Sequence, residues 1–252
     1  MDDLTGDVIA VGSLGKEIYY VLYSNGNLLV RGTGEMYDYD LDTNLSPLRG
    51  NSDIQAVVID EGIVSVGDYV FGNCKNMKNI TLPPSLTSIG QAAFMQGDNY
   101  IGEVCGLTNI AIPSKVTSIS GSAFWGTAIE SLVILDSVTE IGKYAFRDCT
   151  ALKKVTINGT VIGEFMFVSC TKLSNFTIGS KLKKIGSNVF NYCSALKLIT
   201  YDGTLAQWQT IEKGNNWDGK SAMDIAKSGL TKIQCTDGYL EYADGTWNEV
   251  KE

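Results

Sequence analysis

The sequence contains no histidine, and this absence limits the chemistry that the chain can perform. Ser-His-Asp and Cys-His catalysis, zincin-type proteolysis and histidine-ligated metal sites all require an imidazole. Mechanisms that use lysine or carboxylates remain open. No phosphate-binding loop is present, and no dinucleotide-binding glycine pattern follows an expected strand. We therefore expect no catalytic residue, no cofactor and no enzymatic activity.

The side chains of Asp38, Asp40, Asp42 and Asn44 bear oxygen atoms at alternate positions, as at the start of a calcium-binding EF-hand loop. The match fails further along, because Thr43 stands where that loop needs glycine and the twelfth position is an arginine. Two interpretations remain, a weak calcium site and a polar linker. We favour the linker and expect no bound metal.

Four of the six cysteines stand three residues after a recurring phenylalanine, and a fifth is expected at the same place after an insertion. Side chains at equivalent positions of stacked units are parallel, whereas a disulfide needs convergent side chains. We predict buried thiols that pack as small apolar groups. No C-x-x-C pair is present, which argues against redox catalysis. The cysteines are Cys74, Cys105, Cys149, Cys170, Cys193 and Cys235.

An internal repeat organises the chain between residues 54 and 201. A phenylalanine recurs at spacings of 23, 30, 22, 21 and 23 residues, and a glycine stands four residues before most of these phenylalanines. A hexamer with the pattern apolar-x-x-apolar-x-apolar occurs seven times, for example over residues 152–157. Such a period is typical of proteins whose units stack. The phenylalanines are Phe71, Phe94, Phe124, Phe146, Phe167 and Phe190.

Each unit is expected to contribute one strand and one turn. The last three positions of the hexamer alternate between apolar and exposed, and β-branched residues dominate there, which predicts a strand with one buried face. Proline or glycine then turns the chain. For the segment before each phenylalanine, such as residues 143–146, we predict one helical or 3-10 turn on the opposite wall. The phenylalanines would form a buried spine, because one unit cannot bury its own core.

These elements predict an α/β solenoid with a parallel β-sheet on one face and short helical or 3-10 turns on the other. We assign residues 1–53 to an N-terminal β-hairpin cap, 54–201 to the repeat solenoid and 202–252 to a C-terminal helix plus hairpin cap. The N-terminal hairpin turns at Asn25-Gly26, a strong hairpin signal.

The C-terminal cap is predicted to begin with a helix over residues 204–214. Leu205, Trp208 and Ile211 stand at helical spacing, and Gly214 would stop the helix. A second short helix is expected over residues 221–229. The final segment would form a hairpin around Asp237-Gly238.

The exposed strand positions form two rows of mostly small and polar residues without aromatic side chains. We weigh a solvated sheet against a face that binds a partner. Residues 96–104 form an insertion, either a neutral loop or a site of specificity, since inserted loops often carry binding residues. The candidate binding residues on the rows and the insertion are Asn79, Thr81, Asn109, Lys154, Thr156, Thr177, Asn99 and Tyr100.

The composite unit L-x-x-I-x-I-P-x-S-V-T-x-I-G-x-x-A-F-x-x-C resembles the BspA-type leucine-rich repeat family. Residues 107–124 and 129–149 carry the resemblance most clearly, and it extends over residues 54–201. Members are mostly bacterial surface or secreted proteins, implicated as adhesins that bind host proteins or other cells. The resemblance therefore implies a leucine-rich repeat fold, a host or extracellular protein partner, and a location at the cell surface or outside the cell.

Charge and hydropathy narrow the choice of partner. Acidic residues outnumber basic ones by 28 to 20, and the net charge of −8 disfavours nucleic acids and anionic membranes. No apolar run approaches the roughly 20 residues that cross a bilayer. The acidic N-terminus does not read as a signal peptide, so either a leader is absent from this chain or the protein is cytoplasmic. We expect a monomer.

Two further functions stay open beside protein binding. One is a solenoid that binds or cleaves carbohydrate. The strand rows offer no acidic pair across adjacent units, which argues against cleavage. The other is a purely structural spacer.

Overall fold

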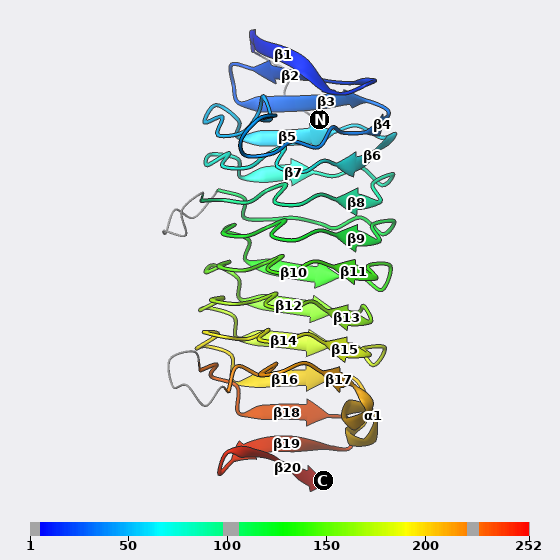
Figure 1. Ribbon diagram of the computed structural model, residues 1–252, viewed down its shortest axis with the longest axis vertical. Helices are drawn as coiled ribbons and strands as arrows, with labels where there is room; N and C mark the ends of the chain where they lie inside the picture. Colours follow the sequence, from blue (N-terminus) through cyan, green and yellow to red (C-terminus); the bar gives the residue numbers. More distant parts are fainter. Residues whose placement is uncertain (1–5, 98–105, 221–226, 252) are drawn as a thin grey trace.

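The computed structural model describes residues 6–97, 106–220 and 227–251. The chain winds into a stack of coils, with the N-terminal strands at one end and the C-terminal strands at the other (Figure 1). Most coils lay one strand on the front, reverse, and return along the opposite wall (Figure 1). Parallel sheets dominate, as the repeat pattern predicts. Among the described residues, no helix is long and apolar enough to cross a membrane.

The front strands form what we call the strand face. Neighbouring coils pair in parallel and in register, whereas pairing at the two ends of the stack is antiparallel. The first front sheet contains β1 (Val8–Gly15), β2 (Ile18–Tyr23), β3 (Asn27–Gly32), β5 (Ala56–Ile59) and β7 (Asn79–Thr81). The second contains β10 (Ser131–Ile134), β12 (Lys154–Ile157), β14 (Asn175–Ile178), β16 (Leu198–Tyr201), β18 (Lys232–Cys235), β19 (Gly238–Ala243) and β20 (Thr246–Lys251).

Short strands pair on the opposite wall, which we call the back wall. They lie just after the turn that follows each front strand, and they also pair in parallel. One sheet contains β4 (Gly34–Glu35), β6 (Ile63–Val66), β8 (Ser88–Ile89), β9 (Ser118–Ile119) and β11 (Glu140–Ile141), and another contains β13 (Val161–Ile162), β15 (Lys184–Ile185) and β17 (Glu212–Lys213).

The predicted helical or 3-10 turn before each phenylalanine is wrong. Two left-handed residues flank the phenylalanine in every unit except that of Phe94, as Tyr144 (φ 63°) and Asp148 (φ 56°) flank Phe146. Left-handed residues cannot continue a right-handed helix. The backbone N–H groups of these segments instead donate to carbonyls of the next coil, as Phe146 does to Met166 at 3.1 Å. The back wall is therefore a second ladder between coils.

The recurring glycine allows coils to approach closely at this wall. A Cβ atom at Gly90 would lie 2.7 Å from the carbonyl carbon of Gly67 in the preceding coil. A Cβ at Gly186 would lie 2.6 Å from the backbone nitrogen of Glu164. Such distances are too short for carbon, so any larger residue would push two coils apart.

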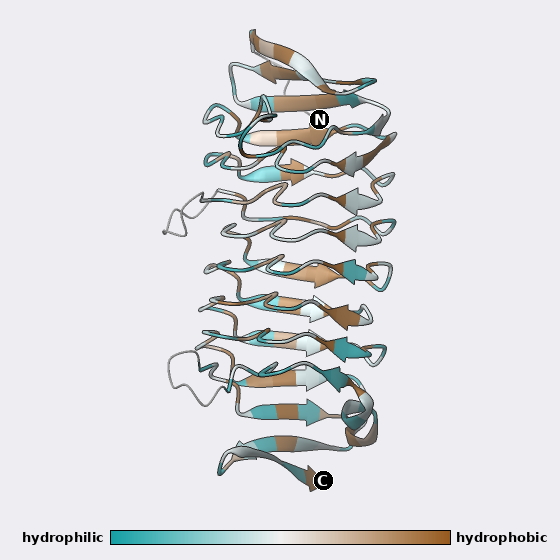
Figure 2. Ribbon diagram, in the orientation of Figure 1, coloured by the Kyte–Doolittle hydropathy of each residue, from teal (hydrophilic) through white to brown (hydrophobic). Residues whose placement is uncertain are grey.

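The predicted phenylalanine spine is present and fully buried. Successive rings stack with nearly parallel planes and centroids 5.0–6.3 Å apart. Phe176 of β14 packs edge-on against Phe190 from the strand side, with centroids 5.0 Å apart. In Figure 2 the strands carry both hydrophobic and hydrophilic colours, as expected where one face packs on this spine.

The front ladder is interrupted at the third repeat, and the strand predicted over residues 107–112 is not formed. An isolated bridge from Asn79 to Asn109 is the pairing recorded there. No hydrogen bond joins the backbones of residues 80–82 and 110–112, all of which are described. We call this interruption the open joint. It lies within the 30-residue spacing between Phe94 and Phe124.

Both ends differ in part from expectation. β2 and β3 form the predicted hairpin around Asn25-Gly26, but β1 beside them was not predicted. The predicted hairpin around Asp237-Gly238 is formed by β18 and β19, and β20 extends it. Residues 221–226, where the second helix was expected, lie outside the described residues.

The C-terminal helix α1 spans Leu205–Thr210, with Thr204 and Gln207 forming a capping box at its start. The prediction that Gly214 stops this helix is wrong. It ends at Ile211, because Glu212 and Lys213 pair as strand β17 with β15 of the preceding coil. Trp208 packs over Tyr201 with ring centroids 5.3 Å apart, as expected for a residue that covers the last coils.

The predicted thiol ladder is confirmed for Cys149, Cys170 and Cys193, which are free and buried, and the Cys74 thiol is buried as well. Each thiol donates to a carbonyl of the preceding coil: Cys149 to Phe124 at 3.2 Å and Cys193 to Phe167 at 3.0 Å. Burial raises the pKa of both thiols to about 12. Cys105 lies outside the described residues.

The spine predicts the effect of Phe146→Ala. Removing a buried ring leaves a cavity between two stacked neighbours, so the free energy of unfolding should fall by about 3–5 kcal/mol. Urea unfolding followed by circular dichroism measures this loss. The variant Lys154→Ala, whose side chain is exposed on β12, serves as a control and should change stability by no more than about 0.5 kcal/mol. A loss below about 1 kcal/mol for Phe146→Ala would contradict a packed spine.

The raised thiol pKa values predict slow alkylation of the folded protein. A cysteine thiol in an unfolded chain has a pKa of about 8.5, so at pH 9 most of these thiols are thiolates. In the folded chain the thiols of Cys149 and Cys193 stay protonated at that pH. Peptide mass spectrometry after iodoacetamide treatment should find these two residues labelled only in denaturant. Because the thiols of the unfolded chain ionise first, the contribution of these two residues to the free energy of unfolding is complete below the unfolded pKa and declines as pH rises towards 12. Rapid native labelling would refute the buried ladder.

Candidate binding surfaces

Three of the predicted binding residues gather at the open joint. Asn79, Thr81 and Asn109 line a surface depression of about 380 Å³ together with Ala111 and Ser131. The side chains come from adjacent coils, and their exposed positions follow from the alternation along β7. Amide and hydroxyl groups therefore surround a stretch of backbone that is not tied into a ladder.

The remaining predicted residues are distributed differently. Lys154, Thr156 and Thr177 lie in the intact second sheet, where Thr156 pairs with Thr177 across β12 and β14. They form a flat surface and do not converge on a pocket. Asn99 and Tyr100 of the insertion lie outside the described residues.

Backbone geometry gives the open joint its chemistry. In parallel sheets each strand satisfies its peptide groups through both neighbours. Here the backbone N–H of Thr108 donates to the Lys78 carbonyl at 3.2 Å, and the N–H of Glu130 donates to the Thr108 carbonyl at 3.1 Å. Beyond these two hydrogen bonds, the backbones of Ile110 and Ala111 are bonded to neither neighbouring coil. Unpaired peptide groups at a surface remain available to water or to a ligand that donates and accepts hydrogen bonds.

Two exposed ion pairs lie beside the ends of the front strands. Glu130 meets Lys153 at 2.9 Å, so it does not stand opposite a second carboxylate as a glycosidase site requires. Lys181 and Asp136 meet at 2.6 Å, and this lysine lowers the pKa of the Asp136 carboxyl. Exposed pairs of this kind contribute little to stability.

The loop from Asp38 to Asn44 uses its oxygen atoms internally. Oδ1 of Asp40 accepts the backbone N–H groups of Asp42, Thr43 and Asn44 at 2.7–2.9 Å, and Oδ2 accepts the Thr43 hydroxyl. These hydrogen bonds hold the pKa of Asp40 well below its usual range. Among the described residues no group of three acidic or cysteine side chains is placed to hold a metal. The geometry is that of a turn closed by its own aspartate.

A cluster of aromatic side chains that the repeat pattern does not predict lies on the back wall. The position two residues before each spine phenylalanine is left-handed, and its side chain is half-buried in every coil except that of Ala92, which is buried. Tyr144 and Phe165 occupy it in neighbouring coils, with centroids 4.9 Å apart. We call this series the back column, and in chain order its members are Tyr69, Ala92, Ser122, Tyr144, Phe165 and Asn188.

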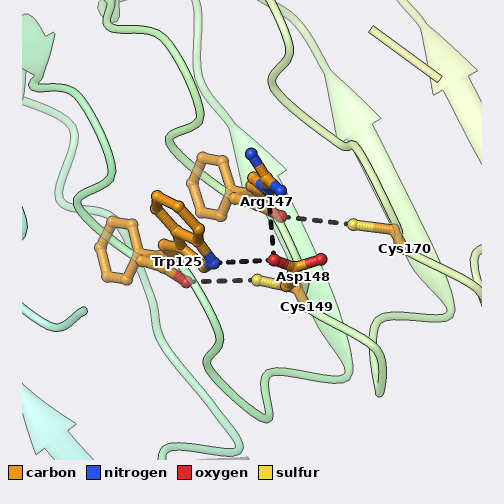
Figure 3. A network of polar contacts seen from close by, with 7 residues as sticks. Trp125, Arg147, Asp148, Cys149 and Cys170 are labelled. Atoms are coloured by element: carbon orange, nitrogen blue, oxygen red, sulfur yellow. Dashed lines mark hydrogen bonds and ion pairs between the residues drawn. The ribbon is translucent and has the colours of Figure 1, made fainter. Parts of the chain in front are cut away.

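Trp125 adds a second ring beside this column, and a polar network fixes it (Figure 3). Its Nε1–H donates to Oδ2 of Asp148 at 2.8 Å, and the same oxygen accepts Nε of Arg147 at 3.2 Å. The Arg147 guanidinium lies over the Trp125 ring, 4.6 Å from its centroid, and 5.4 Å from that of Tyr144. Cation–π and charge-assisted contacts thus hold the indole in one orientation.

The sequence contains a signal for this surface in the residues around each spine phenylalanine. A helical turn, which the sequence predicts there, does not define which side chain of the segment reaches the surface. Once the left-handed residues are known, the positions two before and one after each phenylalanine form aligned columns. Tyr69, Trp125, Tyr144 and Phe165 fall on those columns.

The indole–carboxylate contact predicts a measurable coupling. Trp125→Phe removes the donor and keeps the ring, and Asp148→Ala removes the acceptor. A double-mutant cycle by urea unfolding should give a coupling free energy of about 1 kcal/mol. The cycle cancels the backbone cost of alanine at the left-handed Asp148 position. A coupling near zero would mean that the indole is not held by this carboxylate.

The sequence matches a known repeat family over most of its length. The family model described as BspA type leucine rich repeat region matches residues 49–103 and 97–211 in six copies, which is more than half of the chain. No curated protein sequence matches the chain.

Several solved structures resemble the fold. A leucine-rich repeat protein of T. pallidum is 20% identical, with a TM-score of 0.50 over 72% of this chain and 89% of that one. A leucine-rich repeat protein of Bacteroides ovatus is 19% identical, with a TM-score of 0.45 over 93% and 71%. A leucine-rich cell surface protein of Faecalibacterium prausnitzii is 16% identical, with a TM-score of 0.33 over 82% and 98%. The repeat units, their spine and the family match together show that this chain belongs to the BspA-type leucine-rich repeat family.

Proposed function

We propose that this protein is a non-enzymatic, adhesin-like binding module that recognises a host or other extracellular protein through the strand face. The observation that carries the proposal is the open joint, where Asn79, Thr81 and Asn109 surround unladdered backbone. The family match supports a protein-interaction repeat module.

The chemistry of the strand face suits a protein partner. Its exposed side chains are mostly short and polar, so they lose little conformational entropy when a partner covers them. The open joint adds a depression with amide groups, and these can match the donors and acceptors of a peptide segment. A sheet without such a break would offer only side chains.

The setting of the proposed function is extracellular. Members of the family are mostly surface or secreted proteins, and we propose the cell surface or the extracellular medium for this chain as well. We also propose that it acts as a monomer, with neither nucleic acid nor a membrane interior as partner, given its net charge of −8. Its role would be cell–cell or host-protein adhesion.

The strand face can be tested with a double variant, Asn79→Ala with Asn109→Ala. Surface plasmon resonance would measure binding of the full chain to a panel of immobilised extracellular-matrix proteins. Loss of two central polar contacts should weaken binding about tenfold or more. Thr117→Ala with Thr139→Ala is the matched control, because both threonines are exposed on the back wall.

Two results would contradict the proposal. One is the absence of binding to every protein on the panel, and the other is binding that the double variant leaves unchanged. A variant with residues 96–104 shortened should accompany the experiment. If only that variant loses binding, specificity resides in the insertion and the strand-face assignment is wrong.

A further inference from the structure

The back column is interrupted by two small residues. Tyr144 and Phe165 fill it with rings in successive coils, and Tyr69 fills it in the first repeat, but Ala92 and Ser122 stand between them. A cavity of about 210 Å³ opens where these two rings are missing. The cavity, which we call the slot, is lined by aromatic side chains from two different repeats, Tyr69 and Trp125.

The two ends of the slot are aromatic walls. Tyr69 lies at the end nearer the N-terminus and Trp125 at the other, and both line the cavity. Arg147 and Tyr144 contact Trp125 from the next coil along, on the side away from Tyr69. Asp148 fixes the indole edge, so this wall is preorganised before anything binds.

The rim of the slot is polar and uncharged. Gln91 donates from Nε2 to the Tyr69 hydroxyl at 2.8 Å and is itself exposed. The Ser122 hydroxyl also lines the cavity, while Leu41 and Met95 complete its sides. Each of these polar groups can both donate and accept a hydrogen bond.

The charges nearby disfavour an anionic occupant. Asp68 accepts the backbone N–H of Gln91, and Asp148 lies behind Trp125. The one cation of the network, Arg147, is already paired with Asp148 at 3.2 Å. The chain as a whole carries a net charge of −8. A neutral group therefore fits the slot better than a carboxylate, sulfate or phosphate.

We propose that the slot binds one neutral pyranose unit of a glycan. A pyranose has two faces rich in C–H groups and an edge of hydroxyls. Its faces match the two aromatic walls, and its edge matches the amide and hydroxyl groups of the rim. The cavity is smaller than the roughly 300–1,000 Å³ of drug-sized sites, which suits a single sugar ring.

This site is separate from the strand face, so it extends the proposed function and does not depend on it. The competing occupant is an aromatic side chain or a proline of a partner protein. The donor–acceptor groups on the rim favour the sugar, because an apolar side chain would leave them unpaired.

The test uses Ser122→Tyr, which restores the missing ring. Ser122 has φ 56°, close to the values of Tyr144 and Phe165 at equivalent positions, so tyrosine can be accommodated there. Thr156→Tyr adds the same side chain to the strand face and is the control. The probes are neutral methyl pyranosides of the gluco, galacto, manno and N-acetylglucosamine series, followed by the indole N–H resonance of Trp125 in NMR titrations.

At least one glycoside should shift the Trp125 resonance in the wild-type chain and in Thr156→Tyr. Its affinity should fall about tenfold or more in Ser122→Tyr. Gln91→Ala, an exposed change that leaves the walls intact, should weaken the same binding and guards against misfolding of the tyrosine variant. Circular dichroism would establish that each variant is folded.

Three outcomes would overturn the proposal. No glycoside of the panel shifts the Trp125 resonance, or the shift is the same in Ser122→Tyr, or a proline-rich or aromatic peptide competes at this slot while the glycosides do not. None of these outcomes bears on the strand-face variants, so failure here is distinguishable from failure of the proposed protein binding.

Discussion

Stacking of the coils is the constraint on which the rest of the structure depends. A single coil has no second layer against which to bury its phenylalanine, so each spine ring stacks on the rings of the neighbouring coils. Hydrogen-bond ladders run beside the spine between the front strands, between the short strands of the back wall and between its left-handed turns. The thiol of each described repeat cysteine adds a further contact to the preceding coil. Every surface feature is displayed on this frame.

The left-handed residues of the back wall decide what the protein shows on that side. Non-glycine residues seldom adopt this conformation, which costs roughly 1–2 kcal/mol. Here they recur in coil after coil, because the alternation aims N–H groups at the next coil and satisfies the backbone. As a consequence Tyr144 and Phe165, two residues before the spine phenylalanines, are half-buried and pack on each other at the back wall instead of joining the buried spine.

The two candidate surfaces arise from departures from the repeat. The open joint exists because one coil fails to continue the front ladder, and the aromatic slot exists because Ala92 and Ser122 replace rings in the back column. The coils of β12 and β14, by contrast, continue the front ladder in register. In a repeat protein the irregular units are therefore the informative ones.

The sequence by itself determined the repeat, the spine, the thiol positions and the hairpins at both ends. Each of these depends on residue type at fixed spacing, such as Phe146 and Cys149 or the turn at Asn25-Gly26. It also named Asn79, Thr81 and Asn109, because strand alternation places them outward. The tertiary structure alone decided that residues 107–112 form no strand, that α1 ends before Gly214, and that the back wall is left-handed. Those features depend on which hydrogen bonds form between coils. The residue pattern within one coil does not specify the contacts that the neighbouring coil makes with it.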